Sequence, residues 1–483
     1  MSSDAPAIVW FRQDLRLTDN PALAAACANG RPVIALYILD EESEGVRPPG
    51  GASRWWLHKS LESLALSLSE TGQRLVLRRG GALGVLKDLV RETGASSVLW
   101  NRCYEPGAIA RDTAVKSVLQ SAGVDVESFN ASLLLEPWQI ETGQGGPYKV
   151  FTPFWNRLRE LHRPPTLVEP AARIPAVPSV AGDDLDQWSL LPDKPDWAGG
   201  LRDAWEVGEA AAQQRLSAFL DAPVADYPTD RDRPDRPGTS CLSPHLHWGE
   251  IGPHQVWRAA ASLIYAGDPR SGGAESLLRE LAWRDFNHHL LFHFPTIVTA
   301  NWRPKFDTFP WRDDPQGLAA WQCGQTGYPI VDAGMRELWA TGWMHNRVRM
   351  IVGSFLVKDL LTDWRAGEAW FWDTLVDADL ANNVGNWQWV AGSGADASPF
   401  FRIFNPVSQG EKFDPQGGYV RRWVPELADV PDKWIHRPWD APADVRAAAN
   451  FTLGGSYPRP IVDHARARVR ALEIYKSLSD PDD

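Results

Sequence analysis

The first 130 residues alternate short runs of β-branched and aliphatic residues with amphipathic stretches of helical length. The apolar runs have the length of buried strands: Ala7–Phe11, Pro32–Leu39, Arg74–Leu77, Ser97–Trp100 and Val124–Phe129. Helical patterns lie between them, over residues 21–28, 52–71, 83–92 and 108–121. Because strands that alternate with helices pair in parallel, this pattern predicts a doubly wound, Rossmann-like α/β domain over residues 1–130.

The chain changes character after a proline-rich stretch. Seven prolines fall between Pro164 and Pro195, so residues 131–200 are predicted to be a connector rather than a packed element. From Leu201 onward a helical period dominates, most clearly over residues 275–292, 330–341, 344–361 and 461–478. The sequence therefore predicts an all-α C-terminal domain over residues 201–483.

Bulk properties exclude several classes of protein. No apolar run approaches the roughly 20 residues that cross a bilayer, and no charged leader opens the chain, so a cytoplasmic protein is expected. The four cysteines are scattered, which argues against a metal site or a disulfide framework. The net charge of -12 means that a nucleic-acid partner would need a local basic patch.

Two segments combine polar groups in ways that suit a bound ligand. Gly238–Ser243 (GTSCLS) places small hydroxyl residues beside a glycine and before a helix, which suits an anion such as a diphosphate. A helix cap by Ser240 or Ser243 explains it about as well. Asp377–Asn383 places two carboxylates and two amides in an apolar stretch, and a flat heterocycle or a helix cap would satisfy them.

Two helical motifs carry charged or amide groups among apolar neighbours. In MHNRVRM, Asn346 and Met350 share one helix face with Arg349 adjacent. In ELAWRD, Glu280 lies near Trp283 and an arginine. A charged surface helix is the simpler explanation of each, but the dense apolar flanks disfavour it.

These motifs belong to a longer set in one order along the chain. The segments are Trp10–Asn20, Thr239–Ser243, Trp339–Val357, Asp377–Trp389, Phe401–Phe413 and Tyr419–Pro425. With them the chain resembles the photolyase/cryptochrome family over nearly its whole length, least at residues 161–201. The resemblance implies an N-terminal antenna domain and a C-terminal helical domain that holds FAD.

The resemblance also implies the cofactor contacts. The residues expected at the FAD phosphates and ribityl chain are Tyr227, Thr239, Ser240, Cys241, Leu242 and Ser243. Cys241 stands where relatives commonly carry a basic residue, which puts one phosphate contact in doubt. Arg349 and Asp377 would form a buried ion pair beside the isoalloxazine, Asp379 would contact the flavin, and Asn383 would donate a hydrogen bond near flavin N5.

Substrate choice follows from the same resemblance. Relatives that repair (6-4) photoproducts carry histidines at the places of Asn346 and Met350. Because this chain lacks them, it resembles the class I members of the family, which use light to split cyclobutane pyrimidine dimers. Glu280 would bond the dimer, and Trp283 and Trp389 would stack on its flipped-out bases. The expected phosphate contacts are Arg231, Arg284, Arg347, Arg402 and Lys412.

Further expectations concern electron supply, partners and the antenna. A tryptophan chain of Trp387, Trp364 and Trp311 would photoreduce the flavin. The implied partner is UV-damaged DNA, bound by a monomer, and the alternative is a cryptochrome-type photoreceptor, disfavoured because little chain follows the last helix. Glu105 would bind a pterin, so methenyltetrahydrofolate is favoured over a deazaflavin as antenna, although a helix cap by Glu105 is equally compatible with the sequence.

Overall fold

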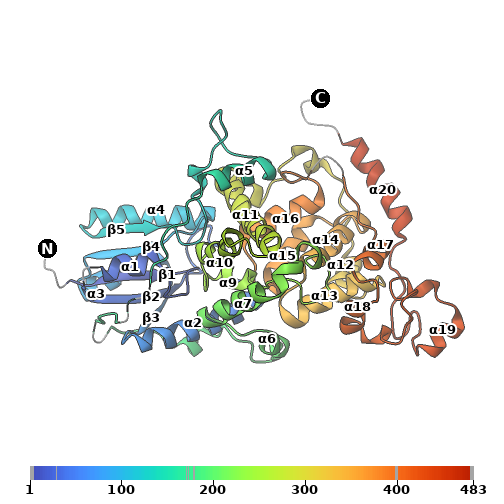
Figure 1. The fold of residues 1–483 in the computed structure, drawn as a ribbon, viewed down its shortest axis with the longest axis horizontal. Helices are drawn as coiled ribbons and strands as arrows, with labels where there is room; N and C mark the ends of the chain where they lie inside the picture. Colours follow the sequence, from blue (N-terminus) through green and yellow to red (C-terminus); the bar gives the residue numbers. More distant parts are fainter. Residues whose placement is uncertain are drawn as a thin grey trace. The chain divides into compact units, whose positions relative to one another are not determined.

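The computed structural model describes residues 5–28, 30–169, 171, 173–177, 180–397 and 401–478. Contacts between backbone segments divide the chain into two compact units. Unit 1 comprises Met1–Ala198, Trp205–Ala225 and Ser240–Pro295, and unit 2 comprises Gly199–Ala204, Asp226–Thr239 and Thr296–Asp483. Each unit is described by itself (Figure 1).

Unit 1 is built on a five-stranded parallel sheet with the order β3-β2-β1-β4-β5. The strands are β1 (Ala7–Phe11), β2 (Val33–Leu39), β3 (Leu75–Arg79), β4 (Ser97–Asn101) and β5 (Asp125–Phe129). The connecting helices are α1 (Pro21–Cys27), α2 (Gly51–Glu70), α3 (Ala82–Thr93) and α4 (Pro106–Ser121). The predicted doubly wound sheet is thus confirmed, with its topological switch point between β1 and β4.

The local signals for this sheet act as the sequence suggested. β1 and β2 are buried along their whole length, as strands covered on both faces must be. The Asn20 side chain accepts a hydrogen bond from the backbone N–H of Leu23, and Pro21 occupies the first turn of α1. Trp10 and Trp100 meet edge to face in the core, with ring centroids 5.7 Å apart.

The rest of unit 1 includes a helix within residues 131–200, the stretch predicted to be a connector. Helix α5 (Phe151–Leu161) lies in that stretch and buries Phe151 and Phe154. It packs against α11 (Ser271–His293), which also packs on α10 (Pro253–Tyr265). The Asp285 carboxylate of α11 accepts hydrogen bonds from the N–H groups of Leu134 and Leu135, and burial raises its pKa to about 6. Some helices beyond residue 201, such as α10 and α11, therefore belong to the same unit as the sheet. The domain boundary predicted at residue 201 stays a prediction.

The described part of unit 2 contains helices and no β-strand, as expected for the all-α half. Its longer helices are α12 (Pro315–Gln322), α13 (Pro329–Thr341), α14 (Asn346–Ser354), α15 (Trp364–Thr374), α16 (Leu380–Ala391), α17 (Pro406–Phe413) and α20 (His464–Ser477). The helix predicted over residues 344–361 is not uniform. It begins at Asn346 and turns into a π-helix, η6 (Phe355–Asp359), where Lys358 and Asp359 are buried and bonded to other segments.

The helices fall short of what a bilayer requires. Among those that the structure describes, none is both long and apolar enough to span a membrane.

Candidate cofactor and nucleic-acid sites

A partly buried ion pair joins α14 to the segment that precedes α16. The Arg349 Nη2 atom lies 2.8 and 3.1 Å from the two carboxylate oxygens of Asp377, which is 8% exposed. The Arg349 Nε atom donates to the Met344 carbonyl at 2.8 Å, which fixes the guanidinium plane. The structure thus brings together the pair predicted beside the isoalloxazine.

Asp379 begins α16 as its N-cap. Its carboxylate accepts hydrogen bonds from the backbone N–H of Asn382 at 2.8 Å and from the Asn382 amide at 2.7 Å. The helix-cap explanation left open by the sequence therefore holds for this residue. The cap also fixes the start of the helix that carries Asn383 and Trp387.

Asn383 is held by a residue that the sequence did not single out. Its Nδ2 atom donates to the Glu368 Oε1 at 2.8 Å and to the Glu368 carbonyl oxygen at 3.1 Å. Both amide hydrogens have acceptors within the protein here, and the predicted donation from Asn383 to a flavin stays a prediction. Among the described residues no donor contacts its Oδ1 atom, which leaves Asn383 a hydrogen-bond acceptor for a ligand.

Trp387 packs directly on a glycine of α15. A Cβ atom at Gly367 would lie 2.1 Å from the Trp387 ring, so only glycine fits there. The ring also contacts Phe371 and Trp321, at centroid distances of 5.0 and 6.2 Å. The buried Trp387 Nε1–H has no hydrogen-bond partner among the described residues.

The two other tryptophans of the predicted chain also lie in unit 2. Trp364 opens α15 and donates from Nε1 to the Asn301 side chain at 3.0 Å. Trp311 packs on Phe309, with centroids 4.2 Å apart. The contacts of these rings are with other residues rather than with one another, so the tryptophan chain stays a prediction.

His345 supplies a second buried polar atom without a protein partner. Its Nδ1 atom accepts from the Arg347 N–H at 3.2 Å and caps α14. Burial lowers the pKa of His345 to about 4, so the ring is neutral near pH 7 and its Nε2 atom carries the proton. That Nε2–H, like the Trp387 N–H, meets no acceptor in the described part of the chain. Buried donors without a protein acceptor are of the kind that a heterocycle with carbonyl groups, such as flavin, can satisfy.

The residues predicted around the FAD phosphates divide between the two units. Tyr227 and Thr239 belong to unit 2, whereas Ser240, Cys241, Leu242 and Ser243 belong to unit 1. The Ser240 hydroxyl accepts from the Leu242 N–H at 3.4 Å, a contact within the segment. Leu242 is the N-cap of α9 (Ser243–His247), which has no side-chain cap hydrogen bond, so the capping explanation is not supported.

The backbone of this segment is tightly constrained. Cys241 adopts φ +49°, a left-handed conformation that is unusual for a residue other than glycine. A Cβ atom at Gly238 would lie 2.7 Å from Asp230, which explains why a glycine precedes the segment.

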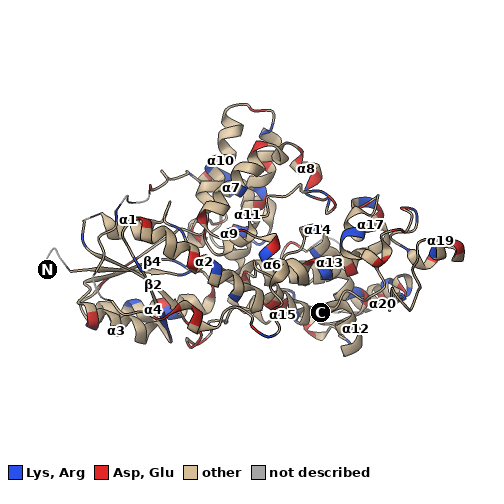
Figure 2. Ribbon diagram, turned by 90° about the horizontal axis from the view of Figure 1, so that it is seen from below, with Lys and Arg blue, Asp and Glu red and all other residues tan. Residues whose placement is uncertain are grey.

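Basic side chains gather around Phe413 in unit 2. The Arg347 guanidinium lies 4.4 Å and the Lys412 ammonium 4.9 Å from the Phe413 ring centroid. Asp232 binds Arg347 at 2.7 Å and orients it. Figure 2 shows basic and acidic residues interspersed along the helices of both units, so this group is a local feature of an acidic protein. The Arg231 guanidinium lies 5.6 Å from the Tyr227 ring centroid.

Further candidates for DNA contact lie near α16 and on α14. Arg402 is exposed, and its guanidinium carbon lies 5.8 Å from the half-buried Trp389 ring. Asn346 is exposed and Met350 is half-buried on α14, four residues apart and on one face. A ligand from solvent can therefore reach these side chains.

The candidates on α11 belong to unit 1. Trp283 stacks on Phe151, with centroids 3.6 Å apart and planes 7° apart, and Glu280 is half-buried one turn earlier. Arg284 donates to the carbonyl oxygens of Ser132 and Leu246. These bonds hold neighbouring segments of unit 1, so the geometry favours a structural role for Arg284 over the predicted phosphate contact.

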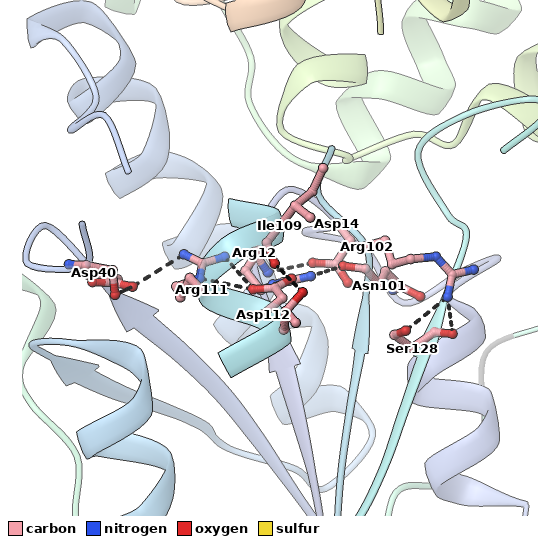
Figure 3. A network of polar contacts seen from close by, with 11 residues as sticks. Arg12, Asp14, Asp40, Asn101, Arg102, Ile109, Arg111, Asp112 and Ser128 are labelled. Carbon is pink, nitrogen blue, oxygen red and sulfur yellow. Dashed lines mark hydrogen bonds and ion pairs between the residues drawn. The ribbon is translucent and has the colours of Figure 1, made fainter. Parts of the chain in front are cut away.

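The carboxyl edge of the sheet, where a doubly wound fold usually binds ligands, is filled by its own side chains (Figure 3). The Arg12 guanidinium binds Asp112 at 2.8 Å and the Asn101 carbonyl, and is 6% exposed. Asn101 in turn donates to Asp14 at 2.6 Å, and Arg111 reaches Asp40 at 3.3 Å. Charges that are paired in this way leave no free cation at the switch point among the residues drawn.

The segment predicted to bind a folate, Asn101–Glu105, is similarly engaged. Arg102 and Tyr104 both donate hydrogen bonds to Glu136, and Cys103 is half-buried, with its pKa raised to about 11 by desolvation. Glu105 is the N-cap of α4, and its side chain makes no cap hydrogen bond. The predicted pterin contact of Glu105 stays a prediction.

Comparison with known proteins places the chain in a family. Residues 7–176 match the family described as DNA photolyase, and residues 277–477 match the FAD binding domain of DNA photolyase. A deoxyribodipyrimidine photo-lyase of Agrobacterium fabrum is 53% identical over 98% of both chains. Cryptochrome-1 of Arabidopsis thaliana is 42% identical over 96% of this chain and 69% of its own. The chain belongs to the DNA photolyase/cryptochrome family.

A solved structure gives the same result for the fold. A bacterial class III photolyase from Agrobacterium tumefaciens superposes with a TM-score of 0.95 at 52% identity, over 99% of this chain and 98% of that one. The sequence suggested class I, whereas this similar structure is of class III. The assignment to class I therefore stays a prediction.

Proposed function

We propose that the protein is a light-dependent DNA repair enzyme of the deoxyribodipyrimidine photo-lyase type, with FAD as its cofactor. The observation that carries this proposal is the 53% identity to a photo-lyase over 98% of the chain. The partly buried Arg349–Asp377 pair and the acceptor Asn383 agree with it, because they suit a flavin held in a pocket.

Bound FAD would supply the electron that opens the lesion after it absorbs light. Arg349 and Asp377 would anchor the flavin ring, and the Asn383 oxygen would accept a hydrogen bond from a protonated ring nitrogen. Glu280 and Asn346 would stabilise charge that develops on the lesion, and Trp283 and Trp389 would stack on its bases. Arg347, Lys412, Arg402 and Arg231 would contact phosphates.

Within this function we assign cyclobutane pyrimidine dimers, flipped out of the DNA, as the lesion. Asn346 and Met350 offer no imidazole, whereas repair of a (6-4) photoproduct needs a proton donor at these positions. His345 is no substitute, because it is 3% exposed and its Nδ1 atom serves as a helix cap. The low pKa of His345 supports the same conclusion.

A cryptochrome-type photoreceptor is the second candidate, since Cryptochrome-1 of Arabidopsis thaliana is 42% identical. The experiment that separates the two is product analysis of irradiated oligonucleotides that carry either a cyclobutane dimer or a (6-4) photoproduct. We expect light-dependent repair of the dimer alone. Repair of the (6-4) lesion would refute the lesion assignment, and repair of neither would favour the photoreceptor.

Three finer expectations accompany this proposal. The enzyme works as a monomer in the cytoplasm, and it carries an antenna, methenyltetrahydrofolate in preference to a deazaflavin. The antenna is the weakest of these on structural grounds, since Asn101 and Arg102 are bonded within unit 1. The absorption spectrum of the purified protein, before and after denaturation, reports both pigments at once.

A further inference from the structure

Lys358 is a buried lysine in η6, directly after the helix that carries Asn346 and Met350. The residue is 2% exposed, and its ammonium group donates to the Arg402 carbonyl oxygen. The same ammonium lies 4.4 Å from the Phe401 ring centroid. A lysine is rarely buried to this extent, and both of its contacts are with the segment Phe401–Phe404.

Other contacts fix this segment on both sides of Arg402. Phe401 stacks on Tyr475 of α20, with centroids 4.5 Å apart and planes 4° apart. The Phe404 N–H donates to the Ser354 hydroxyl at 3.1 Å. The backbone of residue 402 is thus held while its side chain extends into solvent.

Lys358 also lies next to the surface assigned to DNA. Lys358, Trp389, Arg402 and Phe404 line one small cavity, and Arg402 lies against the Trp389 ring. We propose that the buried ammonium of Lys358 positions the Phe401–Phe404 segment, and through it Arg402, for binding of the damaged strand. This inference rests on the proposed function, because that function gives Arg402 its partner.

The charged groups around Lys358 give the inference a pH dependence. Asp359, on the same element, binds His464 at 2.6 Å, and Arg470 donates to its carbonyl oxygen; both partners come from α20. Arg402 is the charged group on the facing segment. Burial lowers the pKa of Lys358 to about 7. The ammonium is therefore present below pH 7 and lost as the pH rises through that value, and its attraction to the Phe401 ring is lost with it.

The test uses full-length protein with bound flavin and a Lys358→Met variant. Two quantities are measured between pH 6 and 9: the dissociation constant for an oligonucleotide with a cyclobutane dimer, in the dark, and the exchange rate of the Phe404 amide hydrogen in free protein. Wild type should bind more weakly as the pH rises past 7. Lys358→Met should bind about ten-fold more weakly at pH 6.5, show no pH step at 7 and exchange the amide faster. Lys358→Arg should restore part of the affinity.

Lys433→Met is the matched control, because Lys433 is exposed and also lies over an aromatic ring, that of Trp434 at 4.6 Å. It should leave the Phe404 amide exchange rate unchanged. The repair rate at saturating DNA should be the same for Lys358→Met as for wild type, since positioning affects binding. A pH step that persists in Lys358→Met would show that another group causes it and would overturn the inference, as would unchanged amide exchange. The proposed function can also fail by itself. If wild-type protein binds no dimer while the Phe404 amide exchanges faster in Lys358→Met, the proposed function is refuted and the positioning role of Lys358 stands.

Discussion

The Asn383 amide nitrogen lies 2.8 Å from the Glu368 carboxylate and 3.1 Å from the Glu368 carbonyl oxygen. Glu368 therefore determines which atom of Asn383 is left for a ligand. With its nitrogen engaged, Asn383 presents oxygen, an acceptor suited to the N–H of a reduced flavin ring.

Glu368→Ala should make the flavin harder to reduce, because the Asn383 amide can then rotate and the reduced ring loses an oriented acceptor. One hydrogen bond of about 1 kcal/mol corresponds to a fall of about 20 mV in the two-electron midpoint potential. Spectroelectrochemical titration measures it. Glu368→Gln retains an acceptor at the same place and should stay close to wild type; an equal fall in both variants would contradict this role.

Trp387→Phe should abolish photoreduction of oxidised flavin while repair by chemically reduced enzyme is nearly retained. The predicted electron chain feeds the flavin and is not on the path to the lesion. Steady illumination followed by absorption spectroscopy measures the first activity, and dimer repair under anaerobic conditions measures the second. Trp434→Phe, a half-buried tryptophan outside the chain, is the control. Equal loss of both activities in Trp387→Phe would indicate a packing role, since this ring rests on Gly367.

Arg347→Ala should weaken DNA binding and reduce the salt dependence of the association constant, by about one unit of the log–log slope for each phosphate that the variant no longer neutralises. Arg284→Ala should instead lower the thermal stability and leave that slope unchanged, because its guanidinium bonds backbone carbonyls. Binding titrations at several salt concentrations, with a melting curve for each variant, test both statements. A flattened slope in Arg284→Ala would restore the sequence-based assignment.

Glu280→Ala should lower the repair rate by about ten-fold or more at saturating lesion, the scale for losing one group that stabilises developing charge. The measurement is a single-turnover flash experiment with reduced enzyme. Glu275→Ala is the control on the same helix, because this exposed residue pairs with Arg159 on the surface. If the two variants behave alike, Glu280 does not contact the lesion.

Glu337→Gln should change how stability depends on pH. Burial raises the pKa of Glu337 to about 7, while its carboxylate accepts bonds from Tyr419 at 2.6 Å and from the His345 N–H at 3.2 Å. The folded protein thus binds a proton that the unfolded chain releases between about pH 4.5 and 7, and stability falls as the pH rises through that window. The loss is about 3 kcal/mol. Between pH 5 and 8, the melting temperature of Glu337→Gln should rise relative to that of wild type as the pH increases. A constant difference between the two melting temperatures would contradict this.

The fold of unit 1 was predictable because each strand is marked by a local apolar run and each helix by its period. The start of α1 was predictable for the same reason, since the Asn20 cap and Pro21 both act within the first turn of the helix. Helix α5 was missed although its buried residues, Phe151, Phe154, Trp155 and Leu158, recur with helical spacing, because the region was assigned to the proline-rich connector that follows it.

The site was predictable where a motif is contiguous, as for Asp377 and Asp379. Glu368 lies 15 positions before Asn383 and on another helix, so no spacing rule connects them. Lys358 did leave a signal, since it is a lone lysine in an apolar run (residues 351–361), but which backbone it holds depends on the tertiary fold.

The paired charges at the carboxyl edge of the sheet also constrain the order of events on the ribosome. Arg12 is buried at the end of β1, and the carboxylate that compensates it, Asp112, emerges 100 residues later. Until then, closing the sheet would bury an uncompensated cation, which costs several kcal/mol. The nascent α/β unit should therefore resist proteolysis only after α4 has left the exit tunnel, so synthesis, rather than the strands' own propensity, sets the time at which the sheet closes.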